Sequence, residues 1–181
     1  MILVVDMNSK MNSFGFSEFV LPVLSIAEEL EECVVRHYLE INGEDLNDYQ
    51  KIILSGSALK NTVTLDQTAR FRWLKDFGKP VLGICAGMQT AGLVFGGRLI
   101  RCNEIGMIEI ATSKANLLFS TKVKVYALHN YALVPPAEFE VIANSPKCVH
   151  AIRHKQKNIF GVLFHPEVRN KEIIERFIQA F

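Results

Sequence analysis

The chain has 181 residues, of which 49% are hydrophobic and 22% are charged, and its formal net charge is +1. This composition is typical of a globular protein, and the length predicts a single domain over residues 1–181. The balanced charge argues against a nucleic-acid partner, and the lack of a long apolar run argues against a membrane segment.

The cysteine pattern predicts reduced thiols. Cys33, Cys85, Cys102 and Cys148 are widely separated, and no pair has the spacing of zinc ligands. A chain of this size does not depend on a disulfide framework. The first residues lack the basic segment and cleavage site of a signal peptide. We therefore expect a cytoplasmic protein without a metal or cofactor.

Strand-like and helix-like segments alternate in the first half of the chain. Short apolar runs predict buried parallel strands at residues 2–5, 33–36, 51–54 and 80–84. Apolar residues near helical spacing predict helices at residues 14–32, 64–77 and 90–95. Pro22 lies inside the first helical pattern, so that helix begins near the proline or bends there. Thr64 and Gln67 fit a capping box at the start of the second.

The second half is rich in strands. Apolar and alternating segments predict them at residues 98–100, 105–110, 122–128, 139–143, 148–153 and 159–164. A last helix is predicted at residues 171–180, with Asn170 as its N-cap. The two halves together predict an α/β fold: a doubly wound, mostly parallel central sheet with helices on both faces and an antiparallel strand extension.

Residues 83–89, with the sequence Gly-Ile-Cys-Ala-Gly-Met-Gln, lie between a predicted strand and a predicted helix. Cys85 has a glycine two positions away on each side, the pattern of a nucleophile elbow. The amides at the start of the following helix favour the reactive thiolate. The pattern alone fits a buried structural cysteine equally well.

A cysteine nucleophile needs a base, and His165 is the best of the five histidines. It follows the predicted strand at residues 159–164, so it lies at a strand's carboxyl end, and Glu167 is placed to orient its imidazole. His129 follows another strand and is a candidate for lining the substrate pocket. Structural roles are expected for His37, His150 and His154.

The elbow segment and residues 161–168, Gly-Val-Leu-Phe-His-Pro-Glu-Val, together resemble the class I (triad) glutamine amidotransferases, over nearly the whole chain. This resemblance implies a flavodoxin-like fold and a glutaminase triad of Cys85, His165 and Glu167. It implies oxyanion donors at Ala86 and at Gly56 or Ser57. It also implies that the residues that hold the substrate glutamine are Gln89, His129, Asn130 and Tyr131.

Within the class, residues 104–106, 139–145 and 159–162 look most like the glutaminases of GMP synthase. The length suits a separate glutaminase subunit, and the sequence has no nucleotide-binding loop of its own. The resemblance therefore implies an ATP-dependent synthetase partner, the GMP synthase ATP-pyrophosphatase subunit, which receives the ammonia. Two segments depart from the family pattern: Ser-Gly-Ser-Ala at residues 55–58 replaces Ser-Gly-Gly-Pro, and Leu-His-Asn-Tyr at residues 128–131 replaces Ser-His-Gly-Asp.

Three other interpretations stay open. The chain could serve another amidotransferase, of the anthranilate, aminodeoxychorismate or carbamoyl phosphate synthase type. It could be a cysteine hydrolase similar to gamma-glutamyl hydrolase. It could also be a regulatory subunit without activity, although Cys85, His165 and Glu167 are all present.

Overall fold

A single mixed sheet organises the computed structural model, which describes residues 1–11, 13–59, 63–119 and 122–181. The strand order is β2-β1-β3-β4-β9-β8-β7-β5-β6. The strands are β1 (Ile2–Asp6), β2 (Cys33–His37), β3 (Lys51–Leu54), β4 (Val81–Ile84), β5 (Arg98–Thr112), β6 (Lys122–Val134), β7 (Phe139–Asn144), β8 (Val149–His154) and β9 (Ile159–Val162). The helices are η1 (Phe16–Val20), α1 (Leu21–Glu28), η2 (Tyr38–Glu40), η3 (Gly43–Leu46), α2 (Val63–Asp66), η4 (Thr68–Lys75), α3 (Ala86–Val94), α4 (Pro166–Arg169) and α5 (Glu172–Ala180).

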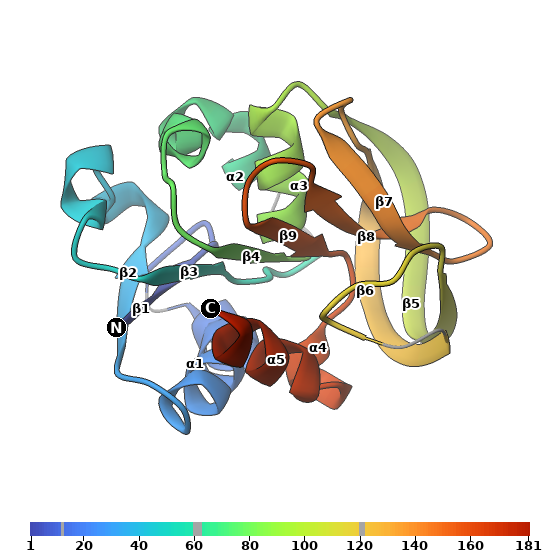
Figure 1. The fold of residues 1–181 in the computed structure, drawn as a ribbon, viewed down its shortest axis with the longest axis horizontal. Coiled ribbons are helices and arrows are strands. Elements are labelled where there is room, and N and C mark those ends of the chain that lie inside the picture. The colour runs from blue at the N-terminus through green and yellow to red at the C-terminus, as the bar shows by residue number, and fades with distance from the viewer. Residues whose placement is uncertain (12, 60–62, 120–121) are drawn as a thin grey trace.

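Helices cover both faces of the parallel half of the sheet. Strands β2, β1, β3, β4 and β9 run parallel, and β1, β3, β4 and β9 are buried at every position. Successive side chains of a strand face opposite sides. Ile2 and Val4 accordingly belong to the core beneath α1 and α5, whereas Leu3 and Val5 belong to the core beneath α3 and η4 (Figure 1). Two apolar layers thus enclose strands that have no polar face.

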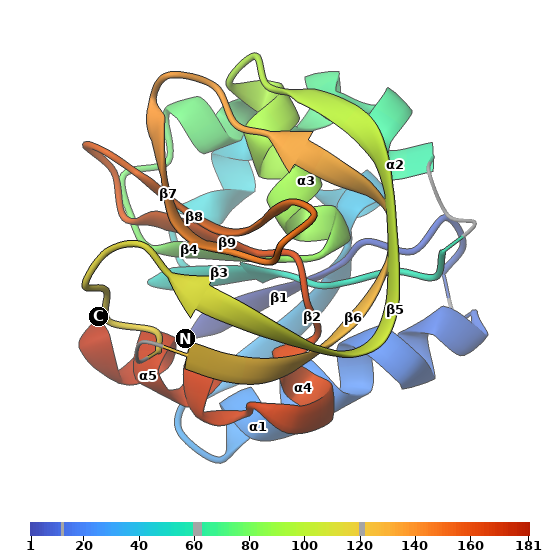
Figure 2. The same ribbon diagram turned by 90° about the vertical axis from the view of Figure 1, so that its right-hand side faces the viewer.

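The other half of the sheet is antiparallel. Strand β8 pairs with β9, β7 with β8, and β5 with both β7 and β6. The long β5–β6 ribbon curves across the side of the molecule (Figure 2). The predicted α/β architecture, with its parallel centre, helices on both faces and antiparallel extension, is confirmed. No helix in the described part of the chain is both long and apolar enough to cross a membrane.

The prediction of separate strands at residues 98–100 and 105–110 was wrong, because β5 is continuous. The pairing of β5 with β6 shifts register between Arg101 and Glu104, which is a β-bulge. The polar residues at the bulge interrupt the apolar alternation without ending the strand. Strand β6 also continues beyond the expected residue 128, to Val134.

Three helix predictions also need correction. The expected helix at residues 14–32 consists of the π-helical turn η1 followed by α1. The expected start near Pro22 is confirmed for α1, because the proline lies in its first turn, where it breaks no helical hydrogen bond. The segment at residues 64–77 contains the short α2 and the 3₁₀ helix η4, and Thr64 lies inside α2. The side chain of Thr64, predicted to form a capping box, lies outside the part of the chain that the structure describes. The N-cap of α5 is Lys171, whereas Asn170 ends α4.

Candidate active site

Cys85 has the backbone of a nucleophile elbow. It connects β4 to α3 with φ 47° and ψ −101°, and it is the only non-glycine residue with positive φ in the described ranges. Its N–H donates to the Val162 carbonyl oxygen at 2.7 Å, which ties the turn to β9. Because such a conformation costs of order 1–3 kcal/mol, it persists only where the surrounding packing enforces it.

The two glycines beside the elbow are required by close packing. A Cβ atom at Gly83 would lie 2.6 Å from the backbone of Gly87 and Met88. A Cβ atom at Gly87 would lie 2.5 Å from the Leu54 carbonyl oxygen. Both contacts are shorter than real Cβ atoms make, so only glycine lets α3 begin directly against β3 and β4.

The Cys85 thiol is 4% exposed and lies at the amino end of α3. Its Sγ atom is 3.7 Å from the carbonyl oxygen of Leu128 in β6. The first four amides of a helix have no partner within the helix, and the helix dipole makes this end positive. The Ala86 N–H therefore belongs to a set of donors suited to a developing negative charge beside Cys85.

His165 and Glu167 form a buried pair next to Cys85. Both side chains are 0% exposed, and the distance between His165 Nδ1 and Glu167 Oε1 is 2.7 Å. The His165 N–H donates to the Tyr126 carbonyl oxygen at 2.9 Å, which fixes the histidine between β9 and β6. This arrangement holds one imidazole nitrogen on the carboxylate and leaves Nε2 for chemistry.

Charges around His165 favour the imidazolium. Burial alone would lower the pKa of His165, because a low-polarity environment disfavours the charged ring. The negative charge and hydrogen bond of Cys85, together with the hydrogen bond that His165 donates to Glu167, outweigh burial and raise the pKa to about 10. His165 is therefore protonated near neutral pH, and its Nε2 atom can give a proton to a leaving group.

Phe19 and Gly56 both lie against the His165 ring. The ring centroids of Phe19 and His165 are 5.3 Å apart. A Cβ atom at Gly56 would lie 2.5 Å from His165 Cε1. The sequence had suggested only an oxyanion role for Gly56 and no role for Phe19. Phe19 lies 146 positions before His165, and a single sequence does not indicate which apolar residue at such a distance contacts the histidine.

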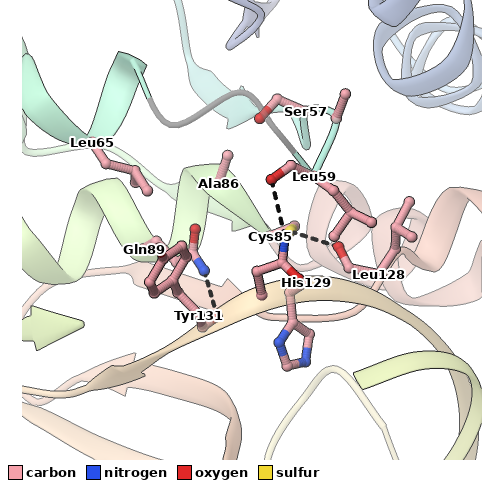
Figure 3. Close-up of a pocket in the computed structure, with 11 residues that line it drawn as sticks. Ser57, Leu59, Leu65, Cys85, Ala86, Gln89, Leu128, His129 and Tyr131 are labelled. Atoms are coloured by element: carbon pink, nitrogen blue, oxygen red, sulfur yellow. Dashed lines mark hydrogen bonds between the residues drawn. The ribbon is translucent and has the colours of Figure 1, made fainter. Parts of the chain in front are cut away.

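The predicted oxyanion loop follows β3 and forms one wall of the pocket. Its first residue, Ser55, is anchored at both ends: its N–H donates to the Val5 carbonyl oxygen at 3.1 Å, and its Oγ accepts from the Met7 N–H at 3.1 Å. Gly56 and Ser57 follow, and Ser57 lines the pocket together with Cys85 and Ala86 (Figure 3). The three residues predicted to bind an oxyanion are thus brought to one place.

The pocket beside Cys85 has a volume of about 20 Å³, enough for about one water molecule. Gln89 and Asn130 line it, but their side chains bond to protein: Gln89 Nε2 donates to the Tyr131 carbonyl oxygen at 2.7 Å, and Asn130 Nδ2 donates to the Leu59 carbonyl oxygen at 3.3 Å. The second bond links β6 to the oxyanion loop across the pocket. The described residues thus leave room beside Cys85 for about one water molecule.

His129 lies at this pocket, where the sequence had placed it. It is among the lining residues, but its ring points away from Cys85 (Figure 3). The ring is 1% exposed and faces Glu104 and His150 instead. Because successive side chains of a strand alternate, the neighbours of His129 face the pocket when His129 does not.

The remaining histidines are buried and have structural contacts. His37, His150 and His154 are 4%, 0% and 6% exposed. His37 Nε2 is 2.7 Å from the Asn8 carbonyl oxygen. His154 Nδ1 accepts from two backbone amides in the turn that follows it.

The sequence model of the family glutamine amidotransferase class-I matches residues 20–181. The chain therefore belongs to the class I glutamine amidotransferases. The resemblance found in the sequence motifs is confirmed.

Relatives with a more specific name are GMP synthases. The chain is 42% identical over 109 residues to a subunit of the glutamine-hydrolyzing GMP synthase of Methanosphaera stadtmanae, covering 54% of this chain and 59% of that one. It is 32% identical over 191 residues to the glutamine-hydrolyzing GMP synthase of Staphylococcus epidermidis, covering 100% of this chain but only 35% of that one. The chain thus spans only part of the length of these relatives.

Solved structures show the same fold. The crystal structure of a protein assigned as a GMP synthase subunit from Thermoplasma acidophilum matches with a TM-score of 0.86 and 25% identity, over 98% of this chain and 92% of that one. A glutamine amidotransferase from Thermotoga maritima matches with a TM-score of 0.71 and 20% identity, over 99% and 80%. The second likeness concerns the fold alone.

Proposed function

We propose that the chain is a glutaminase that hydrolyses the side-chain amide of glutamine through Cys85, His165 and Glu167 and delivers ammonia to a synthetase. The observation that carries this proposal is the strained Cys85, held at the amino end of α3 beside the buried His165–Glu167 pair. A structural cysteine does not need a positive φ. It also does not need a neighbouring histidine whose pKa is raised by the charge of the cysteine sulfur.

The first half of the reaction forms a thioester. The Cys85 thiolate attacks the amide carbon, and the carbonyl oxygen becomes an oxyanion. The amides of Ala86 and of Gly56 or Ser57 donate to this oxygen, and one such donor is worth about 3 kcal/mol in the transition state. Protonated His165 gives its Nε2 proton to the leaving nitrogen, the C–N bond breaks, and ammonia departs from a glutamyl thioester on Cys85.

The second half releases glutamate. Neutral His165 takes a proton from a water molecule, and the resulting hydroxide attacks the thioester carbon. The C–S bond breaks, the Cys85 thiolate is restored, and His165 is again the imidazolium. Glu167 holds the imidazole in one orientation through both halves, as in other triads. Because backbone amides serve the oxyanion, Ser57 can replace the usual glycine if its N–H keeps this direction.

The pocket must open before glutamine can bind, because about 20 Å³ holds about one water molecule. We propose that Gln89, Asn130 and Tyr131 contact the substrate once the Asn130–Leu59 hydrogen bond is released. Through its backbone, His129 forms part of the wall. This closed state suits a glutaminase that becomes active when a partner is present.

We propose a synthetase of the GMP synthase type, which converts XMP to GMP with ATP, as the partner. The support is the name of the relatives at 42% and 32% identity. The sequence itself has no nucleotide-binding loop, so activation of the acceptor falls to the synthetase.

The test is ammonia release from glutamine, measured with and without an ATP-pyrophosphatase subunit of GMP synthase, ATP and XMP. We expect release that depends on Cys85 and increases with the complete partner mixture. Cys85→Ser should abolish release, whereas Cys33→Ser, a change at a thiol on β2, should leave it unchanged. Ammonia release that survives Cys85→Ser would refute the assignment.

The same assay separates the alternatives. Activity that only an anthranilate, aminodeoxychorismate or carbamoyl phosphate synthase partner increases would identify another amidotransferase. Hydrolysis of gamma-glutamyl peptides in preference to glutamine would indicate a gamma-glutamyl hydrolase. Absence of ammonia with every partner would favour a regulatory subunit.

A further inference from the structure

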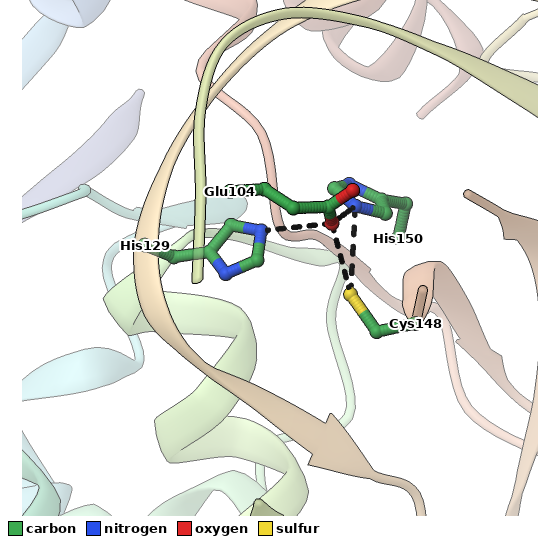
Figure 4. A group of neighbouring side chains, drawn as sticks. All are labelled: Glu104, His129, Cys148 and His150. Carbon is green, nitrogen blue, oxygen red and sulfur yellow. Dashed lines mark hydrogen bonds and ion pairs between the residues drawn. The ribbon is translucent and has the colours of Figure 1, made fainter. Parts of the chain in front are cut away.

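Four potential metal ligands converge behind the pocket wall. They are Glu104 of β5, His129 of β6, His150 of β8 and Cys148 directly before β8, and their ligand atoms all lie within 4.8 Å of one another (Figure 4). Glu104 Oε2 is the common neighbour: it lies 2.8 Å from His150 Nε2, 3.2 Å from Cys148 Sγ and 3.5 Å from His129 Nε2. Cys148 Sγ lies 3.6 Å from His150 Nε2.

His129 is oriented like a metal ligand. Its Nδ1 lies 3.0 Å from the Cys102 carbonyl oxygen, the kind of outer contact that places the proton on Nδ1. The other nitrogen, Nε2, is buried, points into the cluster and has no hydrogen-bond partner in the described part of the chain. A buried lone pair without a donor is costly unless something binds there.

We propose that Glu104, His129, Cys148 and His150 bind one Zn²⁺ ion. In a tetrahedral zinc site with Zn–N near 2.0–2.1 Å and Zn–S near 2.3 Å, neighbouring ligand atoms are about 3.3–3.6 Å apart. The separations of 3.2, 3.5 and 3.6 Å agree with this, the 2.8 Å contact must lengthen, and the other two pairs lie within 4.8 Å. A thiolate, two imidazoles and a carboxylate favour zinc over magnesium or calcium, which prefer oxygen ligands.

The protonation states fit metal binding. The two histidines bind a metal ion as neutral rings, and the Cys148 sulfur binds it as a thiolate. Binding therefore exchanges the thiol proton for Zn²⁺ and releases one H⁺, and the His150 proton moves to Nδ1. The thiolate and the carboxylate then balance the charge of the ion.

Outer contacts hold two of the ligands in place. Ser145 Oγ donates to Glu104 Oε2 at 3.2 Å and accepts from the Cys148 N–H at 3.2 Å. A bound ion would join β5, β6 and β8 at one point. Because Leu128, the neighbour of His129, contacts the Cys85 sulfur, the ion would also fix the pocket wall. The cluster does not contain Cys85 or His165, so the proposal is independent of the glutaminase mechanism.

The test is a Co²⁺ titration of the metal-free, reduced full chain, followed by Zn²⁺ competition with a chromophoric chelator. We expect one ion per chain, tetrahedral d–d bands, and a thiolate-to-cobalt charge-transfer band that Zn²⁺ removes. The melting temperature should rise with Zn²⁺ concentration, because the ion binds only the folded site.

Two variants identify the ligands. Cys148→Ser replaces the thiol with a hydroxyl of similar size and should abolish the charge-transfer band. It should weaken Zn²⁺ binding more than about 100-fold, because even residues that only hydrogen-bond to metal ligands contribute 10–100-fold to metal affinity. Glu104→Gln should weaken metal binding, but the Co²⁺ that still binds should show the thiolate-to-cobalt charge-transfer band. Circular dichroism of each variant checks that it folds.

Two controls exclude the thiols of Cys33 and Cys85. Cys33→Ser should leave the titration unchanged. Cys85→Ser should also keep the band, whereas loss of the band in Cys85→Ser but not in Cys148→Ser would place the metal at the triad and overturn the proposal. A reduced wild-type chain that takes up no Co²⁺ or Zn²⁺ at micromolar concentrations would overturn it as well.

Discussion

His165 depends on charged neighbours for its ionisation. The ring is fully buried, which by itself opposes protonation, yet the Cys85 thiolate and Glu167 raise its pKa to about 10. Removal of the sulfur should therefore be visible at the imidazole.

We expect the His165 imidazolium to persist until pH rises to about 10 in the wild type. In Cys85→Ser the thiolate charge is lost while burial remains, so the pKa of His165 should fall and the ring should lose its proton at lower pH. NMR titration of the histidine ring resonances measures this. An unchanged pKa in Cys85→Ser would mean that the sulfur does not act on the imidazole.

Gly56→Ala should impair catalysis without unfolding the chain. The added Cβ would lie 2.5 Å from His165 Cε1, so the ring must move. A displacement of about 1 Å can cost roughly 100-fold in rate. We expect kcat for ammonia release to fall by about that factor.

The matched control is Gly78→Ala, since a Cβ atom at Gly78 meets nothing within 4 Å. This variant should retain both activity and stability. Equal effects of the two substitutions would show that Gly56 does not position His165.

At the level of elements, the contact of α3 with β3 and β4 decides where Cys85 stands. The helix approaches so closely that its second residue, Gly87, lies against the Leu54 backbone. Alanine normally stabilises a helix by about 1 kcal/mol relative to glycine. The packing at Gly87 should reverse that preference.

Gly87→Ala is therefore expected to lower the free energy of unfolding by about 1–3 kcal/mol, as overpacking does. Gly92→Ala, in the same helix, should cost less, because its Cβ would meet side-chain atoms of Leu133 and not backbone atoms. Denaturant unfolding of both variants measures which one loses more free energy of unfolding. A stabilised Gly87→Ala would show that the helix can move away from the sheet.

At the level of the whole molecule, the parallel and antiparallel halves of the sheet meet around the pocket. Cys85 belongs to the parallel half, whereas Leu128 and Asn130 belong to the β5–β6 ribbon (Figure 2). The Asn130–Leu59 hydrogen bond closes the gap between them. A partner that moved the ribbon would therefore control access to the thiol.

We expect the synthetase partner, with its nucleotides, to accelerate labelling of Cys85 by a glutamine-analogue alkylator more than labelling by iodoacetamide, because the larger reagent needs more opening of the pocket. Mass spectrometry of the labelled peptides measures both rates. Cys33 is the internal control: burial and then Glu28 and Glu31 raise its pKa to about 11, so it should react slowly in every condition. Equal acceleration for the two reagents would argue against a closed pocket.

The sequence by itself determined the family, the α/β architecture and the candidate triad. These depend on local patterns: apolar runs define buried strands, two glycines flank Cys85 in a strand–turn–helix segment, and Glu167 lies two residues after His165. Neighbours along the chain stay neighbours in space, so such patterns can be recognised without tertiary contacts. The catalytic and substrate-binding roles remain predictions.

Tertiary structure decided the contacts between distant segments. Phe19 and Gly56 meet His165 only because the sheet brings the ends of three chain segments together. The direction of the His129 ring follows from its pairing with Glu104 across β5 and β6. The sequence did not reveal this pairing, because the β-bulge interrupts the alternation of apolar residues in β5. The candidate zinc ligands come from β5, β6 and the start of β8, so their convergence has no spacing in the sequence by which it could be recognised.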